Sequence, residues 1–95
     1  MSVLRLAVKA EYFNAIKAGT KTEEYRLCTV YWHVRIVRRQ YDTVEITLGY
    51  PKRGDTSRRL IFPWNGFETK TITHPHFGTE PVKVYAIKLQ PKAAA

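Results

Sequence analysis

The 95-residue sequence is poor in cysteine, glycine, proline and acidic residues, and it has no long apolar run. Its single cysteine, Cys28, excludes an intramolecular disulfide and a zinc site built from several cysteines, and it favours a reducing, cytoplasmic location. No stretch approaches the roughly 20 apolar residues that span a bilayer, so we expect no membrane partner. Five glycines and five prolines are too few for a fibrous or low-complexity chain.

The chain does contain enough apolar and aromatic material for one compact core. Hydrophobic residues make up 44% of the sequence and aromatic residues 13%, which is typical of a globular protein. A chain of this length forms one domain, which we assign to residues 1–91, with residues 92–95 as a tail of natural or cloning origin. We expect no cofactor and no obligate protein partner.

Positive charge is in excess, with sixteen lysines and arginines against eight acidic residues and a formal net charge of +8. Such a charge favours a polyanionic partner such as RNA, although it can also serve solubility alone. Interleaved aromatics could stack on bases, whereas a solvated basic face above buried aromatics is the simpler alternative. The residues of the predicted nucleic-acid patch are Arg35, Arg38, Arg39, Lys52, Arg53, Arg58 and Arg59.

Alternation of apolar and polar residues predicts most of the strands. Residues 3–8 and 43–48 each place every second residue inward, and residues 82–89 supply a last strand. In the second of these segments we expect Glu45 and Thr47 to point outward. Residues 60–64 and 67–73 flank Asn65-Gly66, a signal for a two-residue hairpin.

Two segments carry helix signals. Residues 11–18 have apolar positions on one face and end at Gly19, a residue suited to a left-handed terminator. Residues 29–39 are ambiguous: a strand would bury Val30, Trp32, Val34 and Ile36, whereas a helix capped by Thr29 would bury Val30, Val34 and Val37. We prefer the helix. The fold class predicted is α+β, a small, mostly antiparallel β-barrel with one or two short helices.

The stretch GTKTEEYRL, residues 19–27, collects ionisable side chains in an extended segment. In a strand, Thr22, Glu24 and Arg26 point to one side and Tyr25 to the other, while Lys21 can turn toward either face. An exposed strand with paired charges would explain this pattern without function. In an apolar cleft, the lysine and glutamate would instead form a coupled acid–base pair.

The histidines of the sequence His74-Pro75-His76 could chelate a metal, but a third ligand at a diagnostic spacing is missing. We therefore predict no metal site and prefer a structured loop whose imidazoles contact a substrate.

The run Gly19-Thr20-Lys21-Thr22-Glu23-Glu24-Tyr25-Arg26 follows a short helix and resembles the G-x-K-T-x-E-x-R signature of the ASCH domain. The resemblance covers nearly the whole chain and implies a PUA-like β-barrel with a cleft lined by the motif lysine, beside a surface suited to RNA. Members of the family include RNA-binding modules, proposed ribonucleases and small bacterial amidohydrolases that deacylate N4-acetylcytidine. A chain of this size most resembles the last group.

In that amidohydrolase branch a threonine, a lysine and a glutamate form the catalytic set. Lys21 matches the lysine, Glu24 stands where the branch has its threonine, and the branch's glutamate lies in a distal region without a match here. We predict metal-independent hydrolysis of N4-acylated cytidine, with Lys21, Glu24 and Thr22 as the catalytic residues. Thr71, Thr73 and Tyr25 are further candidates for the hydroxyl. The residues predicted to bind substrate are Arg26, Tyr25, Trp32, Tyr50, Thr73 and His74.

Two alternatives come from other classes of protein. A non-catalytic domain that binds RNA would account for the net charge of +8. A metal-dependent ribonuclease would use His74 and His76.

Overall fold

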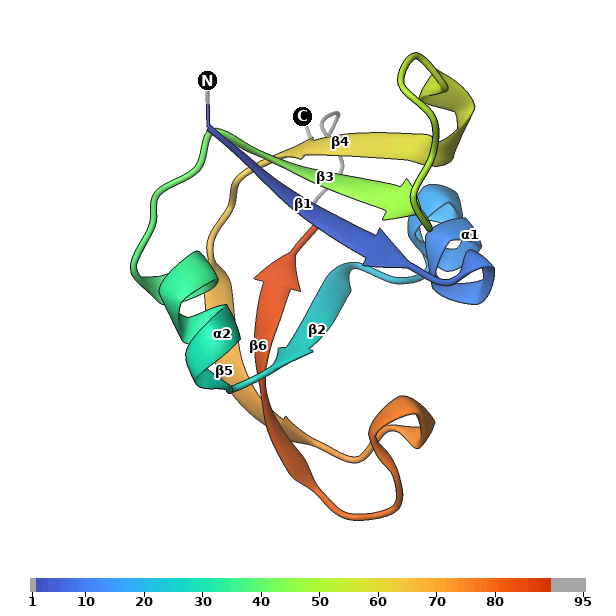
Figure 1. Cartoon of the computed structure of the whole chain (residues 1–95). Helices are drawn as coiled ribbons and strands as arrows, with labels where there is room; N and C mark the ends of the chain where they lie inside the picture. Colours follow the sequence, from blue (N-terminus) through green and yellow to red (C-terminus); the bar gives the residue numbers. More distant parts are fainter. Residues whose placement is uncertain (1, 90–95) are drawn as a thin grey trace.

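A computed structural model describes residues 2–89 and shows two three-stranded sheets in that part of the chain (Figure 1). The first sheet has the strand order β1-β3-β4 and comprises β1 (Val3–Val8), β3 (Thr43–Leu48) and β4 (Arg59–Pro63). β1 runs parallel to β3, and β4 is antiparallel to β3. This parallel pairing requires the long connection through the second sheet's first strand and both helices.

The second sheet has the order β2-β6-β5 and is antiparallel throughout. It comprises β2 (Glu23–Leu27), β6 (Val82–Lys88) and β5 (Phe67–Ile72). The α+β class and the mostly antiparallel pairing are confirmed. The pairing of the described residues leaves two separate sheets, however, so the closed barrel that we expected is not shown. β1 and β2 are therefore both edge strands.

Helix α1 (Ala10–Ala18) follows β1 directly and ends where the sequence predicted. Gly19 has a φ of 84°, and its N–H and the N–H groups of the next two residues bond to carbonyls of the last helical turn. A left-handed residue favours glycine, because a Cβ crowds the backbone there. This turn delivers the chain into β2.

The second helical segment begins as α2 (Val30–Trp32) and continues as η1 (His33–Val37), a turn of π-helix. Thr29 caps it as predicted, accepting a hydrogen bond from the N–H of Trp32. The prediction of its buried face was wrong: Val30 is 82% exposed, whereas Ile36 is 1% exposed. The π turn adds a residue per turn, which rotates Ile36 and not the valines toward the core.

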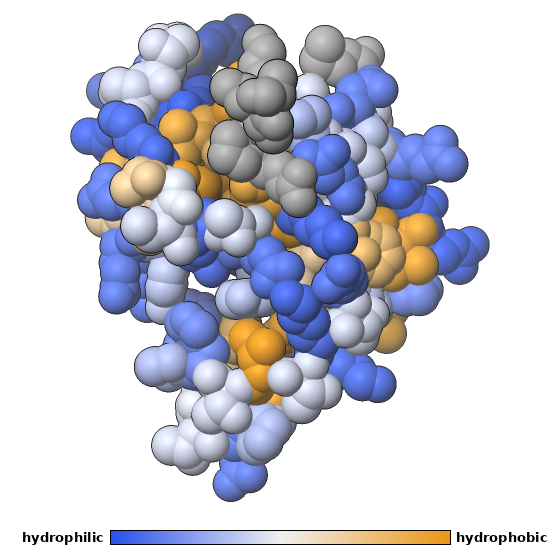
Figure 2. All heavy atoms as spheres, turned by 180° about the vertical axis from the view of Figure 1, so that it is seen from behind, coloured by the Kyte–Doolittle hydropathy of each residue, from blue (hydrophilic) through white to orange (hydrophobic). Residues whose placement is uncertain are grey.

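Because of this rotation, several apolar side chains of the segment are exposed to solvent. Figure 2 shows an apolar patch at its right-hand edge, the side on which α2 lies once Figure 1 is turned by 180°. The exposed apolar residues of the segment are Val30, Tyr31, Val34 and Val37.

The core joins both sheets, α1 and η1 through side chains that are almost fully buried. Val44 and Ile46 from β3 and Ile87 from β6 are inaccessible to solvent. The other members of the core are Leu4, Leu6, Val8, Phe13, Ile16, Ile36, Tyr85 and Leu89.

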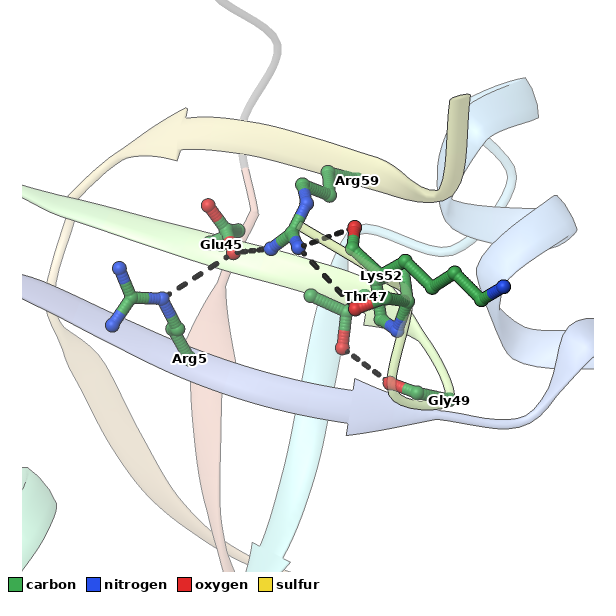
Figure 3. Close-up of polar contacts among 7 residues, drawn as sticks. Arg5, Glu45, Thr47, Gly49, Lys52 and Arg59 are labelled. Atoms are coloured by element: carbon green, nitrogen blue, oxygen red, sulfur yellow. Dashed lines mark hydrogen bonds and ion pairs between the residues drawn. The ribbon is translucent and has the colours of Figure 1, made fainter. Parts of the chain in front are cut away.

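Glu45 and Thr47 alternate with core residues and lie on the outer face of β3, as expected, but both are buried there rather than exposed to solvent. Arg59 Nη1 lies 2.8 Å from Glu45 Oε1, and Arg5 Nε lies 3.5 Å from the same oxygen (Figure 3). β3 is the central strand of its sheet, so side chains from both neighbours close over its outer face.

The hairpin predicted at Asn65-Gly66 was also wrong, since β4 pairs with β3 while β5 pairs with β6. The connection crosses from one sheet to the other. At its start the Trp64 N–H donates to the Asp42 carbonyl, and at its end the Gly66 carbonyl accepts from the Lys88 N–H.

Two short 3-10 helices, η2 (Thr56–Arg58) and η3 (Pro75–Phe77), lie in the connections β3–β4 and β5–β6. Within residues 2–89, no helix has the length and apolar character to cross a membrane.

Candidate functional site

A cavity of about 450 Å³ lies beside the edge strands of the two sheets. The end of β1, the strand β2, the start of α2 and the β5–β6 connection all contribute to its wall. Because β1 and β2 do not pair with each other, the gap between the sheets is open here, and side chains from both edges reach into it. The cavity is thus a consequence of the two-sheet topology.

Three charged side chains from residues 21–26 meet at this cavity. Glu24 is 7% exposed, and its Oε2 lies 3.0 Å from Arg26 Nη2. Its Oε1 lies 3.7 Å from Lys21 Nζ, beyond hydrogen-bonding distance. The buried carboxylate therefore has one firmly bound oxygen and one oxygen that can still accept a hydrogen bond.

Arg26 joins the two sheets. The same Nη2 that binds Glu24 donates to the Ala7 carbonyl of β1 at 3.0 Å, and the guanidinium lies 5.1 Å from the centre of the Trp32 ring. Its Nε is buried and has no hydrogen-bond partner among the described residues. Arg26, which was predicted to bind substrate, lines the cavity and also contacts Glu24 and the Ala7 carbonyl across the open edge.

Lys21 lies before β2 and turns to the face of Glu24, one of the two orientations that the sequence allowed. Its Nζ is 4.4 Å from the centre of the Tyr25 ring and 5.6 Å from that of Tyr12. A desolvated ammonium over aromatic faces is held by cation–π attraction. This arrangement fixes the positive charge beside the carboxylate.

Tyr25 is held from the opposite face of β2. Its hydroxyl donates to Glu23 Oε1 at 3.1 Å, and Lys70 Nζ lies 2.8 Å from both Glu23 oxygens. Burial, followed by the hydrogen bond to Glu23, raises the pKa of Tyr25 above its ordinary 10.0. Tyr25 is therefore neutral at physiological pH and acts as an aromatic wall.

A second cavity of about 410 Å³ adjoins the first. Both are lined by Tyr12, Lys21, Tyr25 and His74, so Lys21 stands at their junction. Thr22, which we predicted to be catalytic, lines only this second cavity.

The two histidines of the β5–β6 connection are organised by η3. His74 Nδ1 accepts a hydrogen bond from the N–H of His76 at 3.1 Å, which caps this short helix. The His74 ring centre lies 5.7 Å from that of Tyr12 and 6.3 Å from that of Tyr25. The described residues contain no group of three or more histidine, cysteine or acidic side chains placed to hold a metal ion.

The cavity brings together most of the residues predicted for a site. Thr73 is exposed and lines neither cavity, and Tyr50 is 95% exposed but borders the main one. The predicted residues that line the main cavity are Lys21, Glu24, Tyr25, Arg26, Trp32, Tyr50 and His74.

Sequence reasoning missed Tyr12, Phe77 and the Ala7 carbonyl. Tyr12 was expected only as part of the apolar face of residues 11–18, and its aromatic side chain was the only signal in the sequence; the structure leaves it half-buried in the wall of the cavity.

The seven residues of the predicted nucleic-acid patch do not form one surface. Arg35, Arg38 and Arg39 belong to η1 and the residues after it, whereas the other four lie in or beside the β3–β4 connection, on the opposite side of the molecule in Figure 1. Arg59 is bound to Glu45, and Arg58 Nε lies 3.5 Å from Asp55. The Arg35 guanidinium stacks on Tyr31 at 3.6 Å.

Comparison of the chain with protein-family models, with curated proteins and with solved structures finds no match. The resemblance to the ASCH domain therefore stays a prediction, and the function is argued from the site.

Proposed function

We propose that this protein is a metal-independent amidohydrolase that removes the acyl group from N4 of an acylated cytidine, on a PUA-like fold of the ASCH type. The observation that carries the proposal is the buried Glu24 carboxylate, which is held between Lys21 and Arg26 in the wall of an aromatic-lined cavity. The substrate class is suggested by the ASCH-like motif. The cavity offers a buried carboxylate, two cations and aromatic side chains, which are the groups that amide hydrolysis of a nucleoside needs.

Glu24 is the general base in this mechanism. Arg26 binds Oε2, so Oε1 is left to accept a hydrogen bond from a water molecule. That water attacks the acyl carbonyl carbon as Glu24 takes its proton. The positively charged Lys21 stabilises the oxyanion that develops on the carbonyl oxygen.

The intermediate then collapses with cleavage of the carbon–nitrogen bond. Glu24 returns the proton to N4, which leaves as the amine of cytidine, and the acyl group leaves as a carboxylic acid. No group on the enzyme is consumed, and the two cations with one carboxylate leave a net positive site that favours the anionic intermediate.

The aromatic residues of the wall suit a flat heterocycle. A volume of about 450 Å³ is in the range of small-ligand pockets, and Trp32, Tyr25 and Tyr50 border it. Any nucleobase, including cytosine, can stack favourably on such rings, because every base has a π face.

The direct test is product analysis by proton NMR with N4-acetylcytidine in buffer that contains a chelator. Equimolar cytidine and acetate are expected from wild-type protein, and neither from Lys21→Ala. Lys17→Ala, on the exposed face of α1, is the matched control and should behave as wild type. Equal, negligible release by wild type and Lys21→Ala would rule the proposal out.

A second candidate function is non-catalytic binding of RNA. It is favoured by Arg38, Arg39, Lys52 and Arg53, which are exposed and form no ion pair with another described residue. Binding to single-stranded RNA should then weaken by about 0.7 log units per log unit of salt for each phosphate contact. A flat salt dependence, or no binding, would remove this candidate.

A further inference from the structure

His74 has only one ring nitrogen free for a ligand. Its Nδ1 accepts the His76 N–H at 3.1 Å, whereas no hydrogen bond to Nε2 is formed by the residues that the structure describes. The ring lines both cavities, so it lies at their junction together with Lys21.

The bond to His76 determines where the imidazole carries its proton. An amide N–H can only donate, so Nδ1 must offer its lone pair, and the neutral ring then has its proton on Nε2. Protonation of Nδ1 would place two donors face to face and remove the cap of η3. The loop geometry therefore places the proton of the neutral His74 ring on Nε2, where it can be donated.

The charged neighbours of the ring are one lysine and two glutamates. Lys21 and His74 lie beside the same two aromatic rings, those of Tyr25 and Tyr12. Glu23 and Glu11 line the second cavity as well. Glu23 is neutralised by Lys70 at 2.8 Å, and Glu11 is exposed at the start of α1.

We propose that His74, as the neutral Nε2–H tautomer, donates a hydrogen bond to the acyl carbonyl oxygen and forms the oxyanion site together with Lys21. This assignment rests on the proposed amidohydrolase function and adds to it a second electrophilic group. It also excludes His74 as the general base, because one ring nitrogen is protonated and the other is occupied. Glu24 is then left as the base.

The tautomer is tested without activity by long-range ¹H–¹⁵N NMR spectra of the imidazole in the full chain, assigned with His74→Gln. We expect the Nε2–H pattern, with Nδ1 unprotonated at neutral pH. A spectrum with the proton on Nδ1 would overturn the proposal.

The catalytic role is tested by steady-state kinetics with N4-acetylcytidine. His74→Ala should lower kcat about 10²-fold, the usual effect of removing one oxyanion donor, with a smaller change in KM. His74→Gln retains an amide N–H near the Nε2 position and should restore part of the loss. Thr79→Ala, an exposed residue of the same connection outside both cavities, is the control.

The outcomes separate the two proposals. Wild-type kcat in His74→Ala, with active wild type, would overturn only the role of His74. Absence of hydrolysis by wild type would overturn the amidohydrolase function and the catalytic role of His74 with it.

Discussion

At the scale of single residues, the site depends on charges that are removed from water but paired. An isolated buried carboxylate costs several kcal/mol, and Glu24 avoids this cost through Arg26 and Lys21. Because Arg26 is itself bound to Ala7, the carboxylate cannot move without breaking a contact between the sheets. The geometry of the proposed base is therefore built into the fold.

Replacing Glu24 by glutamine should lower kcat by about 10²-fold or more, since the amide keeps the shape but cannot accept the proton of water. Initial rates with N4-acetylcytidine measure the effect. Glu68→Gln, on exposed β5 and outside both cavities, is the control and should match wild type. Wild-type rates in Glu24→Gln would show that another group is the base.

The charged part of the site could be predicted because Lys21, Glu24 and Arg26 lie in one contiguous run. Strand alternation and the helix stop at Gly19 are local rules: they put Glu24 and Arg26 on one face, as found, and left the orientation of Lys21 open. Ala7 of β1 and Tyr12 of α1 join the site only through the packing of these elements against β2, which no local pattern reports. The same limit explains the wrong hairpin at Asn65-Gly66: a turn signal gives a reversal of direction but not the partner of each strand.

At the scale of elements, the turn that ends α1 positions Lys21, the first charged residue of the site. Gly19 has a φ of 84°, and apart from its chain neighbours no atom lies within 4 Å of the position of an added Cβ, so backbone strain alone opposes a side chain there. Lys21 follows two residues later, with its N–H bound to the Ala15 carbonyl. The helix end and the position of the lysine are therefore linked.

Gly19→Ala should reduce the free energy of unfolding by about 1–2 kcal/mol, the cost of a left-handed conformation for a residue with a Cβ. Urea denaturation measures the change. Gly19→Asn should lose less, because asparagine tolerates this conformation better. Equal stability of wild type and Gly19→Ala would mean that the turn relaxes to another conformation.

In the segment formed by α2 and η1, the buried face in the structure differs from the face that the apolar pattern predicted. Ile36→Ala should cost about 2–5 kcal/mol of stability, as for other buried large-to-small changes. Val30→Ala, at a position that is mostly exposed, should change stability by less than about 0.5 kcal/mol. Thermal or urea unfolding measures the stability of the two variants. A larger loss of stability in Val30→Ala than in Ile36→Ala would support the buried face predicted from the sequence.

At the scale of the whole molecule, two small sheets share one core, and a buried tyrosine ties its stability to pH. Tyr85 of β6 is almost fully buried, and His33 Nδ1 lies 3.3 Å from its hydroxyl. Burial, followed by the neighbouring Cys28, raises the pKa of Tyr85 above its ordinary 10.0. The folded state therefore holds this proton more tightly than the unfolded chain does.

The stability that this proton contributes is fully present below about pH 10 and is lost as the pH rises through the higher folded-state pKa. Urea unfolding should accordingly show a fall in stability above pH 10, and Tyr85→Phe should make that fall shallower. Tyr50→Phe, at an exposed position, should leave the slope unchanged. An identical slope in wild type and Tyr85→Phe would refute this account.

We propose that Glu24 and Lys21 together hydrolyse an N4-acylated cytidine without a metal. The measurement that tests it most directly is the ultraviolet absorbance of N4-acetylcytidine, followed with wild type, Lys21→Ala and Glu24→Ala in buffer that contains a chelator. We predict loss of the acylated chromophore with wild type alone. No change with any of the three proteins would contradict the claim and favour a cavity that holds a base without altering it.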